Sequence, residues 1–135
     1  MIDLKLAQKL VAAALDKAAA DYGRPICVSI CDTQGFTLSF ARGDNAPVRS
    51  IAIAQGKAYS SARVGVNTDA FLARLQRENI IAGYFCDPAL TALPGGAVIK
   101  SADGRVIGGV GISGLAPSED QAIANAVADM AGATL

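Results

Sequence analysis

The chain has 135 residues, of which 52% are hydrophobic, and its twelve basic and twelve acidic side chains leave no net charge. This length suits a single domain over residues 1–135 with an apolar core, while the balanced charge and the few aromatic side chains argue against a nucleic-acid partner. No apolar run has the length of a membrane span, and the N-terminus lacks the apolar region of a signal peptide, so we expect a cytoplasmic protein with no membrane partner.

The first half of the chain predicts a helix, a hairpin and two more helices. Residues 3 to about 21 have apolar side chains at helical spacing, with Asp3 placed to cap the helix and Gly23 placed to end it. Strands over 26–32 and 36–42 follow, joined by a turn. A helix over about 48–63 comes next, and a third helix, capped at Asn67 or Thr68, extends to about residue 77.

The second half predicts another hairpin and a last helix. Residues 80–88 are expected to form an irregular connection. Apolar runs over 97–100 and 106–113 flank Asp103-Gly104, a dipeptide that favours tight hairpins. Ser118 is expected to cap a helix that continues to about residue 131. The order of these elements predicts an α+β domain with an antiparallel sheet.

Glycines inside the last strand, Gly108, Gly109 and Gly111, need an explanation. Glycine weakens a strand and marks places where another backbone or a ligand comes close. The strand is therefore either a central one under a tightly packed helix or the floor of a ligand site, and both interpretations stay open. The strand position of these glycines, and the misplaced third glycine, argue against a dinucleotide fingerprint, in which they would open a helix.

The chain contains no histidine, which removes the usual general base and the commonest metal ligand. The three cysteines, Cys27, Cys31 and Cys86, are an odd number without CxxC spacing, which argues against a disulfide framework and a zinc site. We therefore predict no metal site built by the protein alone.

Four charged residues are candidates for chemistry. Arg42 and Asp44 lie in a polar loop at a strand end, where sites often occur. Lys57 is either a surface lysine or the positive end of an anion site. Asp120 is interpreted first as a charge that favours the helix dipole and second as a functional carboxylate.

Several short motifs occur in a fixed order along the chain: Cys31-Asp32, Phe40-Ala41-Arg42-Gly43-Asp44, Lys57-Ala58, Leu93-Pro94-Gly95-Gly96 and Gly109-Val110-Gly111-Ile112-Ser113-Gly114, followed by Asp120. From about Leu4 to Ala131, the chain resembles the GlcG/HbpS-like family, which includes the C-terminal domain of PduO-type corrinoid adenosyltransferases. The resemblance implies profilin-like α/β/α layers around a five-stranded antiparallel sheet. It also implies homo-oligomers, and haem or a related tetrapyrrole as the cofactor of some members.

Haem ligation by histidine is impossible in this chain. An iron ligand would have to be Tyr, Cys, Met, Lys or a hydroxyl, and phenolate or thiolate ligation is chemically reasonable. Tyr84 and Cys86 are the nearest candidates by their sequence environment.

The ligand site is predicted where the turn Leu93-Pro94-Gly95-Gly96 meets Arg42, Asp44 and Lys57. Gly95 and Gly96 would present backbone N–H groups, since no Cβ blocks the approach of a ligand. Arg42 and Lys57 would hold a carboxylate such as a haem propionate, and Asp44 would orient one of them. Valine at either glycine is expected to abolish binding and leave the fold intact.

Three functions stay open at this point. The first is a small-molecule or haem-binding oligomer of the GlcG/HbpS type. The second is an enzyme acting on a small organic acid held by Arg42 and Lys57, in which Asp44 or Asp120 moves a proton. The third is an accessory structural subunit with no ligand. Because alanine-rich helix faces bury little area, we expect a homo-oligomer whose contact faces are the second and last helices.

Overall fold

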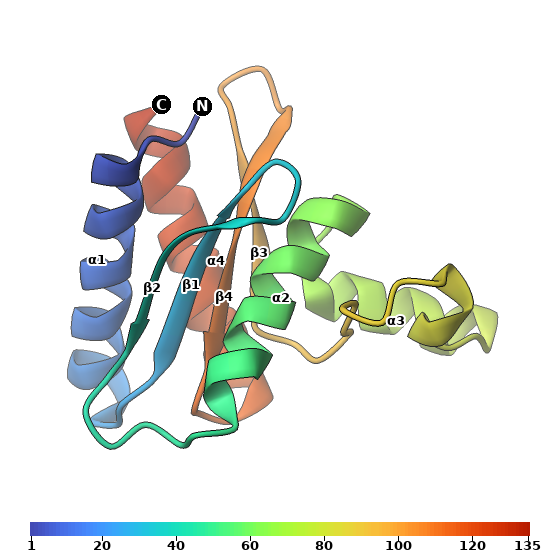
Figure 1. The fold of residues 1–135 in the computed structure, drawn as a ribbon, viewed down its shortest axis with the longest axis horizontal. Coiled ribbons are helices and arrows are strands. Elements are labelled where there is room, and N and C mark those ends of the chain that lie inside the picture. Colours follow the sequence, from blue (N-terminus) through green and yellow to red (C-terminus); the bar gives the residue numbers. More distant parts are fainter.

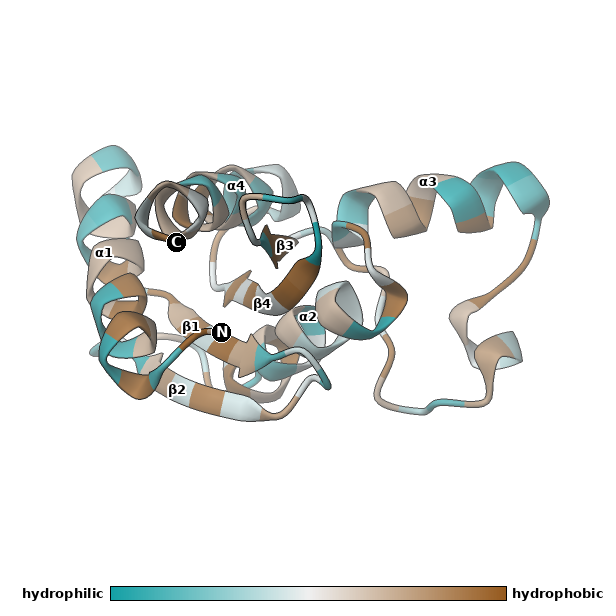
Figure 2. Ribbon diagram, turned by 90° about the horizontal axis from the view of Figure 1, so that it is seen from above, coloured by the Kyte–Doolittle hydropathy of each residue, from teal (hydrophilic) through white to brown (hydrophobic).

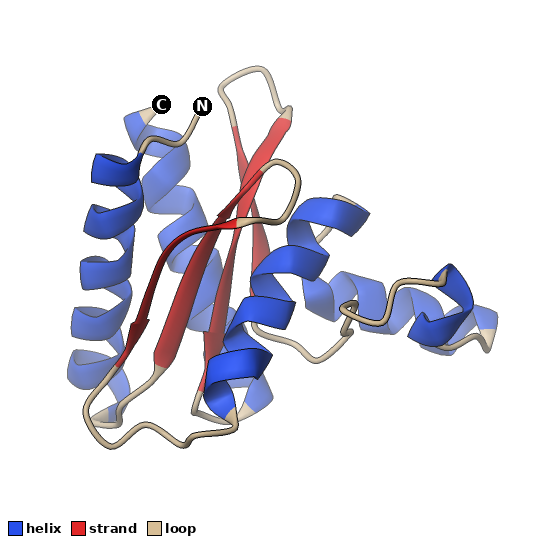
Figure 3. Cartoon of the chain, viewed as in Figure 1, coloured by secondary structure: helices blue, strands red, loops and turns tan.

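The structure is a computed structural model that describes all 135 residues. In chain order, its elements are α1 (Leu4–Tyr22), β1 (Cys27–Asp32), β2 (Thr37–Arg42), α2 (Ser50–Val64), α3 (Thr68–Glu78), the 3-10 turn η1 (Ala82–Phe85), β3 (Gly96–Lys100), β4 (Val106–Ser113) and α4 (Pro117–Thr134). The α+β class and the order of elements are confirmed (Figure 3).

One antiparallel sheet has the strand order β2-β1-β4-β3. Helices α1 and α4 cover one face of this sheet, and α2 covers the other, which gives three layers (Figure 1). The sheet has four strands, not the five that the resemblance implied. The chain forms two hairpins, and the residues between α3 and β3 form η1 and loops.

The ends of the elements follow local capping rules. Asp3 Oδ1 accepts a hydrogen bond of 2.8 Å from the N–H of Leu6, and Gly23 ends α1 with a φ of +62°. The last helix begins at Pro117, one residue before the predicted cap Ser118, because proline suits the first helical position. Glu119 accepts a hydrogen bond from the N–H of Ala116.

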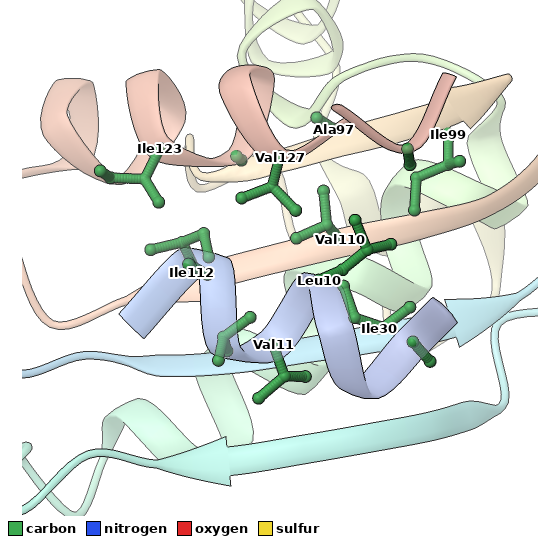
Figure 4. Packing of buried hydrophobic residues seen from close by; sticks show 14 of the residues in the cluster. Leu10, Val11, Ile30, Ala97, Ile99, Val110, Ile112, Ile123 and Val127 are labelled. Atoms are coloured by element: carbon green, nitrogen blue, oxygen red, sulfur yellow. The ribbon is translucent and has the colours of Figure 1, made fainter. Parts of the chain in front are cut away.

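Alternation along the two central strands divides the core into an aliphatic side and a small-residue side. Ile30, Val110 and Ile112 point towards α1 and α4 (Figure 4), and together with Val28 they belong to a cluster of 18 buried residues. The intervening residues face α2, and all of them are small: Cys27, Ser29, Cys31, Gly109 and Gly111. The period of two along a strand therefore separates two different kinds of packing.

The glycines of β4 are explained by the close approach of α2. A Cβ on Gly111 would overlap the carbonyl oxygen of Ala54 and lie 2.5 Å from the nitrogen of Ala58. A Cβ on Gly109 would lie 2.6 Å from the carbonyl oxygen of Ala58. Of the two interpretations of these glycines, the tightly packed helix is the one that the structure bears out, because helix backbone fills the space above them.

Residues 66–93, here called the arm, extend away from the three layers (Figures 1 and 2). The root of the arm is fixed by hydrogen bonds from the N–H of Val98 to Asn67 and from the N–H of Gly96 to Thr68. Within the arm, the rings of Phe71 and Phe85 meet edge to face, with their centroids 5.7 Å apart. None of the helices has the length and apolar character needed to cross a membrane.

Candidate functional site

An open pocket of about 570 Å³, here called the α2 pocket, lies on the outer side of α2. Its walls are the exposed face of α2, the turn between β1 and β2, and the end of the arm. Half of its twelve lining residues are hydrophobic: Gly35, Thr37, Ala52, Ile53, Gln55, Gly56, Tyr59, Pro88, Ala89, Leu90, Thr91 and Leu93. A volume in this range suits a small molecule or cofactor of substantial size.

Tyr59 is held in the wall of this pocket by three neighbours. Its phenolic Oη donates a hydrogen bond of 2.7 Å to Oδ2 of Asp87. The guanidinium carbon of Arg63, one helical turn further along α2, lies 4.9 Å from the centre of the Tyr59 ring. A Cβ on Gly35 would lie 2.6 Å from Cδ2 of Tyr59, so glycine at this turn makes room for the ring.

The hydrogen bond between Tyr59 and Asp87 shifts both pKa values. It raises the pKa of Tyr59 above its ordinary value, because the phenol is stabilised as a donor. It lowers the pKa of Asp87, because the carboxylate is stabilised as an acceptor. At neutral pH the pair is therefore a phenol facing an ionised carboxylate.

A second polar cluster lies inside the protein and is centred on Lys57, whose side chain is fully enclosed. Its Nζ donates to the carbonyl oxygen of Ile112 at 2.7 Å and to Oδ2 of Asp120 at 3.0 Å. The other carboxylate oxygen of Asp120 accepts from the N–H of Leu115. Burial lowers the pKa of Lys57 and raises that of Asp120, although each charge partly offsets the shift of the other. The cluster joins α2, β4 and α4.

Gly95 and Gly96 lie directly against this cluster, so their predicted proximity to Lys57 is found. Their N–H groups, however, already have hydrogen-bond partners within the chain. The N–H of Gly95 donates to Oε1 of Gln121 at 2.7 Å, and that of Gly96 donates to Oγ1 of Thr68 at 2.8 Å. A Cβ on Gly96 would lie 2.5 Å from the carbonyl oxygen of Lys57. The expectation that valine here leaves the fold intact is therefore revised: the added side chain would meet backbone.

The remaining predicted site residues lie elsewhere. Nε and Nη2 of Arg42 donate to the carbonyl oxygen of Ala46, at 3.1 and 2.9 Å. Arg42 and Asp44 line a separate hollow beside α1, whereas Leu93 lines the α2 pocket. Pro94 follows Leu93 in the chain and lines neither of these spaces. The structure thus brings Lys57 and the two glycines together and leaves Arg42 and Asp44 apart from them. Contact of any of these residues with a ligand stays a prediction.

The two sequence-based candidates for an iron ligand are outside the α2 pocket. Tyr84 is 65% exposed on the arm, and Cys86 is also exposed beside it. Cys31 is buried under α2, where it donates to the carbonyl oxygen of Ala58, and burial raises the pKa of its thiol to about 12. Neither Cys31 nor Cys27 is exposed to a ligand at the surface.

Sequence reasoning missed Tyr59 and the outer face of α2. Ala52, Gly56 and Tyr59 follow one another at i, i+4 and i+7, so they form a second stripe beside the buried one of Ala54, Ala58 and Ala62. This second stripe, two small residues followed by an aromatic one, was a sequence pattern from which a pocket wall on the outer face of α2 could have been predicted. No sequence pattern indicated Asp87, because its hydrogen bond with Tyr59 depends on the path that the arm takes back to α2.

Comparisons with known proteins place the chain among relatives of similar fold. The family model described as "Haem degrading protein HbpS-like" matches residues 2–129. A crystal structure of a double mutant of HbpS from Streptomyces reticuli is 30% identical, with a TM-score of 0.86 over 97% of this chain and 87% of that one. An uncharacterised 15.0 kDa protein of Citrobacter freundii, from a dhaT-dhaS intergenic region, is 29% identical over 91% of this chain and 87% of its own length.

A structure of a PduOC complex with haem shares the fold. It has a TM-score of 0.82 and 24% identity over 95% of this chain and 93% of that one.

Proposed function

The chain belongs to the HbpS-like family, and from this premise we propose that it binds haem or a related planar tetrapyrrole in the α2 pocket. The observation that carries the proposal is the composition of that pocket. Half of the lining residues are apolar, they face a space of about 570 Å³, and the ring of Tyr59, whose hydroxyl is anchored by Asp87, forms part of the wall. Mostly apolar pockets with a few placed polar groups are typical of cofactor sites.

The lining residues suit the chemistry of such a ligand. Ile53, Leu90 and Leu93 offer aliphatic surface to a flat aromatic ring system. Arg63 lies outside this lining, over the Tyr59 ring, and offers a positive charge for a carboxylate at the rim, since arginine binds carboxylates in a planar, two-pronged geometry. When bound, haem would supply redox-active iron. The residues of this chain would orient it and limit the access of water.

The description of the family and the name of one relative support the choice of ligand. The family is described as haem-degrading, and the PduOC structure is a complex with haem. These descriptions concern other proteins. They support haem as the ligand of this chain because the chain has a pocket of its own that could hold it. Among the residues predicted for the site, we retain Leu93 as a wall of the pocket.

The organic-acid alternative receives no support from the geometry. It required Arg42 and Lys57 to hold one anion together. Arg42 binds the carbonyl oxygen of Ala46, and the enclosed Lys57 binds Ile112 and Asp120. We therefore do not develop that function further.

We also propose that the protein is a homo-oligomer, with the arm as a contact surface. The alanine-rich face of α2, predicted as a contact face, packs against the chain's own sheet: Ala54 and Ala58 are fully buried. Five of the eleven large apolar side chains that are exposed lie on the arm and its ends: Val66, Ile81, Tyr84, Phe85 and Leu93. Apolar surface of this kind is typical of interaction sites.

Titration of the purified protein with ferric protoporphyrin tests the site. We expect a saturable Soret band at one equivalent per chain. Ala52 is exposed and lines the α2 pocket, so Ala52→Trp should occupy part of the pocket and weaken binding by at least about tenfold. The matched control is Ala12→Trp, at an exposed alanine of α1, which should bind as the unmodified protein does. Equal binding by both variants would place the ligand elsewhere.

A further inference from the structure

We propose that a hollow along the outer edge of β3, here called the edge hollow, binds a small molecule that carries both an ammonium and a carboxylate group, as amino acids do. β3 is an outer strand of the sheet and lies beside α4 (Figure 2). The edge hollow has a volume of about 550 Å³, and its lining includes Asn67, Val98, Lys100, Asn125, Ala128 and Asp129. None of these residues lines the α2 pocket, so the inference is independent of haem binding.

The outer edge of β3 leaves one backbone acceptor open. The backbone groups of Gly96 and Val98 face away from β4. Their N–H groups donate to Oγ1 of Thr68 and Oδ1 of Asn67. Nε2 of Gln121 donates to the carbonyl oxygen of Gly96. The carbonyl oxygen of Val98 faces the same way and receives no side-chain donor, so it offers the edge hollow an acceptor for an N–H group.

The side chain of Asn125 offers a donor whose direction the chain itself fixes. Oε1 of Gln121 accepts from the N–H of Gly95, so the amide nitrogen of Gln121 is the group that donates to Oδ1 of Asn125, at 2.9 Å. Nδ2 of Asn67 donates to the same oxygen at 3.4 Å. With its Oδ1 occupied, Asn125 has both N–H bonds of Nδ2 without an acceptor in the chain. An amide held in this way suits a carboxylate oxygen of a ligand.

Two unpaired charges of opposite sign complete the lining. Lys100 ends β3 and Asp129 lies on α4, where it is one helical turn from Asn125 and so on the same side of the helix. Both charged side chains are exposed, and neither belongs to an ion pair, with the other or with any other residue. A molecule with both charges would satisfy the whole set. Its carboxylate would bind Lys100 and Asn125, and its ammonium group would bind Asp129 and the carbonyl oxygen of Val98.

Three probes of matched shape test this inference: L-valine, 3-methylbutanoate, which lacks the ammonium group, and 2-methylpropylamine, which lacks the carboxylate. Their branched chain suits the apolar surface of Val98 and Ala128 in the lining. Nuclear magnetic resonance of the unmodified protein follows the side-chain NH₂ signals of Asn125. We expect L-valine to shift these signals saturably and each single-charge probe to bind at least about tenfold more weakly.

Two substitutions assign the charges. Lys100→Met should weaken L-valine binding to the level of 2-methylpropylamine, because the carboxylate then has no cation to pair with. Asp129→Asn should weaken it to the level of 3-methylbutanoate, because the ammonium group has lost its anion. The matched controls, Lys9→Met and Asp16→Asn, change exposed charges of α1 and should bind L-valine as the unmodified protein does.

Loss of discrimination between the probes is a result that a merely structural role of Lys100 or Asp129 does not produce. If L-valine gives no saturable shift, or if a single-charge probe binds as tightly, the inference is overturned. Equal binding of L-valine by Lys100→Met and Lys9→Met would show that its carboxylate does not lie in the edge hollow. Haem titration should be unchanged in all four variants, so a failure here leaves the proposed function standing.

Discussion

The three-layered body and the arm are held together in different ways. In the body, helix backbone lies so close to β4 that only glycine fits at positions 109 and 111, and a lysine is enclosed together with its counter-charge. In the arm, α3 buries only Thr68, Phe71 and Leu75, and η1 buries nothing. Contacts within the chain therefore explain why glycine and an enclosed lysine occur in the body. They leave several apolar side chains of the arm exposed and without a partner in the chain.

This difference indicates where function is expected to lie. The body provides a rigid surface, the outer face of α2, and the arm provides the opposite wall of the pocket. The two meet through Tyr59 with Asp87 and through the N–H of Thr91, which donates to Ser60 Oγ at 2.8 Å. A ligand in the α2 pocket would contact both regions and strengthen their attachment.

The largest expected effect comes from filling the space between α2 and β4. Gly111→Val should prevent folding, since even its Cβ would overlap the backbone of α2. Circular dichroism and urea unfolding measure this loss. Gly132→Ala, in α4 with 3.8 Å to the nearest atom, is the control and should stabilise the helix by about 0.5–1 kcal/mol. A folded Gly111→Val protein would contradict the packing described here.

A smaller effect is expected from removing the enclosed lysine. Lys57→Met leaves Asp120 buried without its partner, which should reduce the free energy of unfolding by about 3–5 kcal/mol at neutral pH. Without Lys57, burial alone raises the folded-state pKa of Asp120 above the unfolded value. The variant should therefore regain stability as the pH falls and the carboxyl becomes protonated.

Urea titrations at neutral and acidic pH check both statements. Lys57→Met combined with Asp120→Leu removes both charges and should recover most of the loss. A loss that is the same at every pH would show that Asp120 stays ionised in the variant.

The smallest effect on stability is expected from the arm. Ile81→Ser and Tyr84→Ser change side chains that are 61% and 65% exposed, so unfolding should shift by no more than about 0.5 kcal/mol. Self-association should nevertheless weaken, and sedimentation at several concentrations measures it. Leu4→Ser, at an exposed apolar position of α1, is the control. An assembly unaffected by both arm substitutions would move the contact to another surface.

The body could be predicted from sequence because its signals are local. Helical spacing and Asp3 located α1, and turn residues located both hairpins. The number of strands was wrong because it was taken from the resemblance, whereas the chain itself shows four extended segments.

The site was harder to predict because long-range packing determines it. Lys57 and Gly95 were placed together correctly, but sequence gives no measure of burial, so an enclosed ion pair was interpreted as an anion site. Tyr59 and Asp87 lie on different elements, and only the return of the arm to α2 brings their side chains together.

The central pairing of β1 with β4 joins segments from opposite halves of the chain, and the whole arm lies within the loop that this pairing closes. The entropy lost on closing such a loop grows only with the logarithm of its length, and doubling the loop costs about 0.6 kcal/mol. Residues inserted into the arm or removed from it would therefore change the free energy of closing the sheet very little. The arm can differ in length and sequence among related chains while the same four strands still pair.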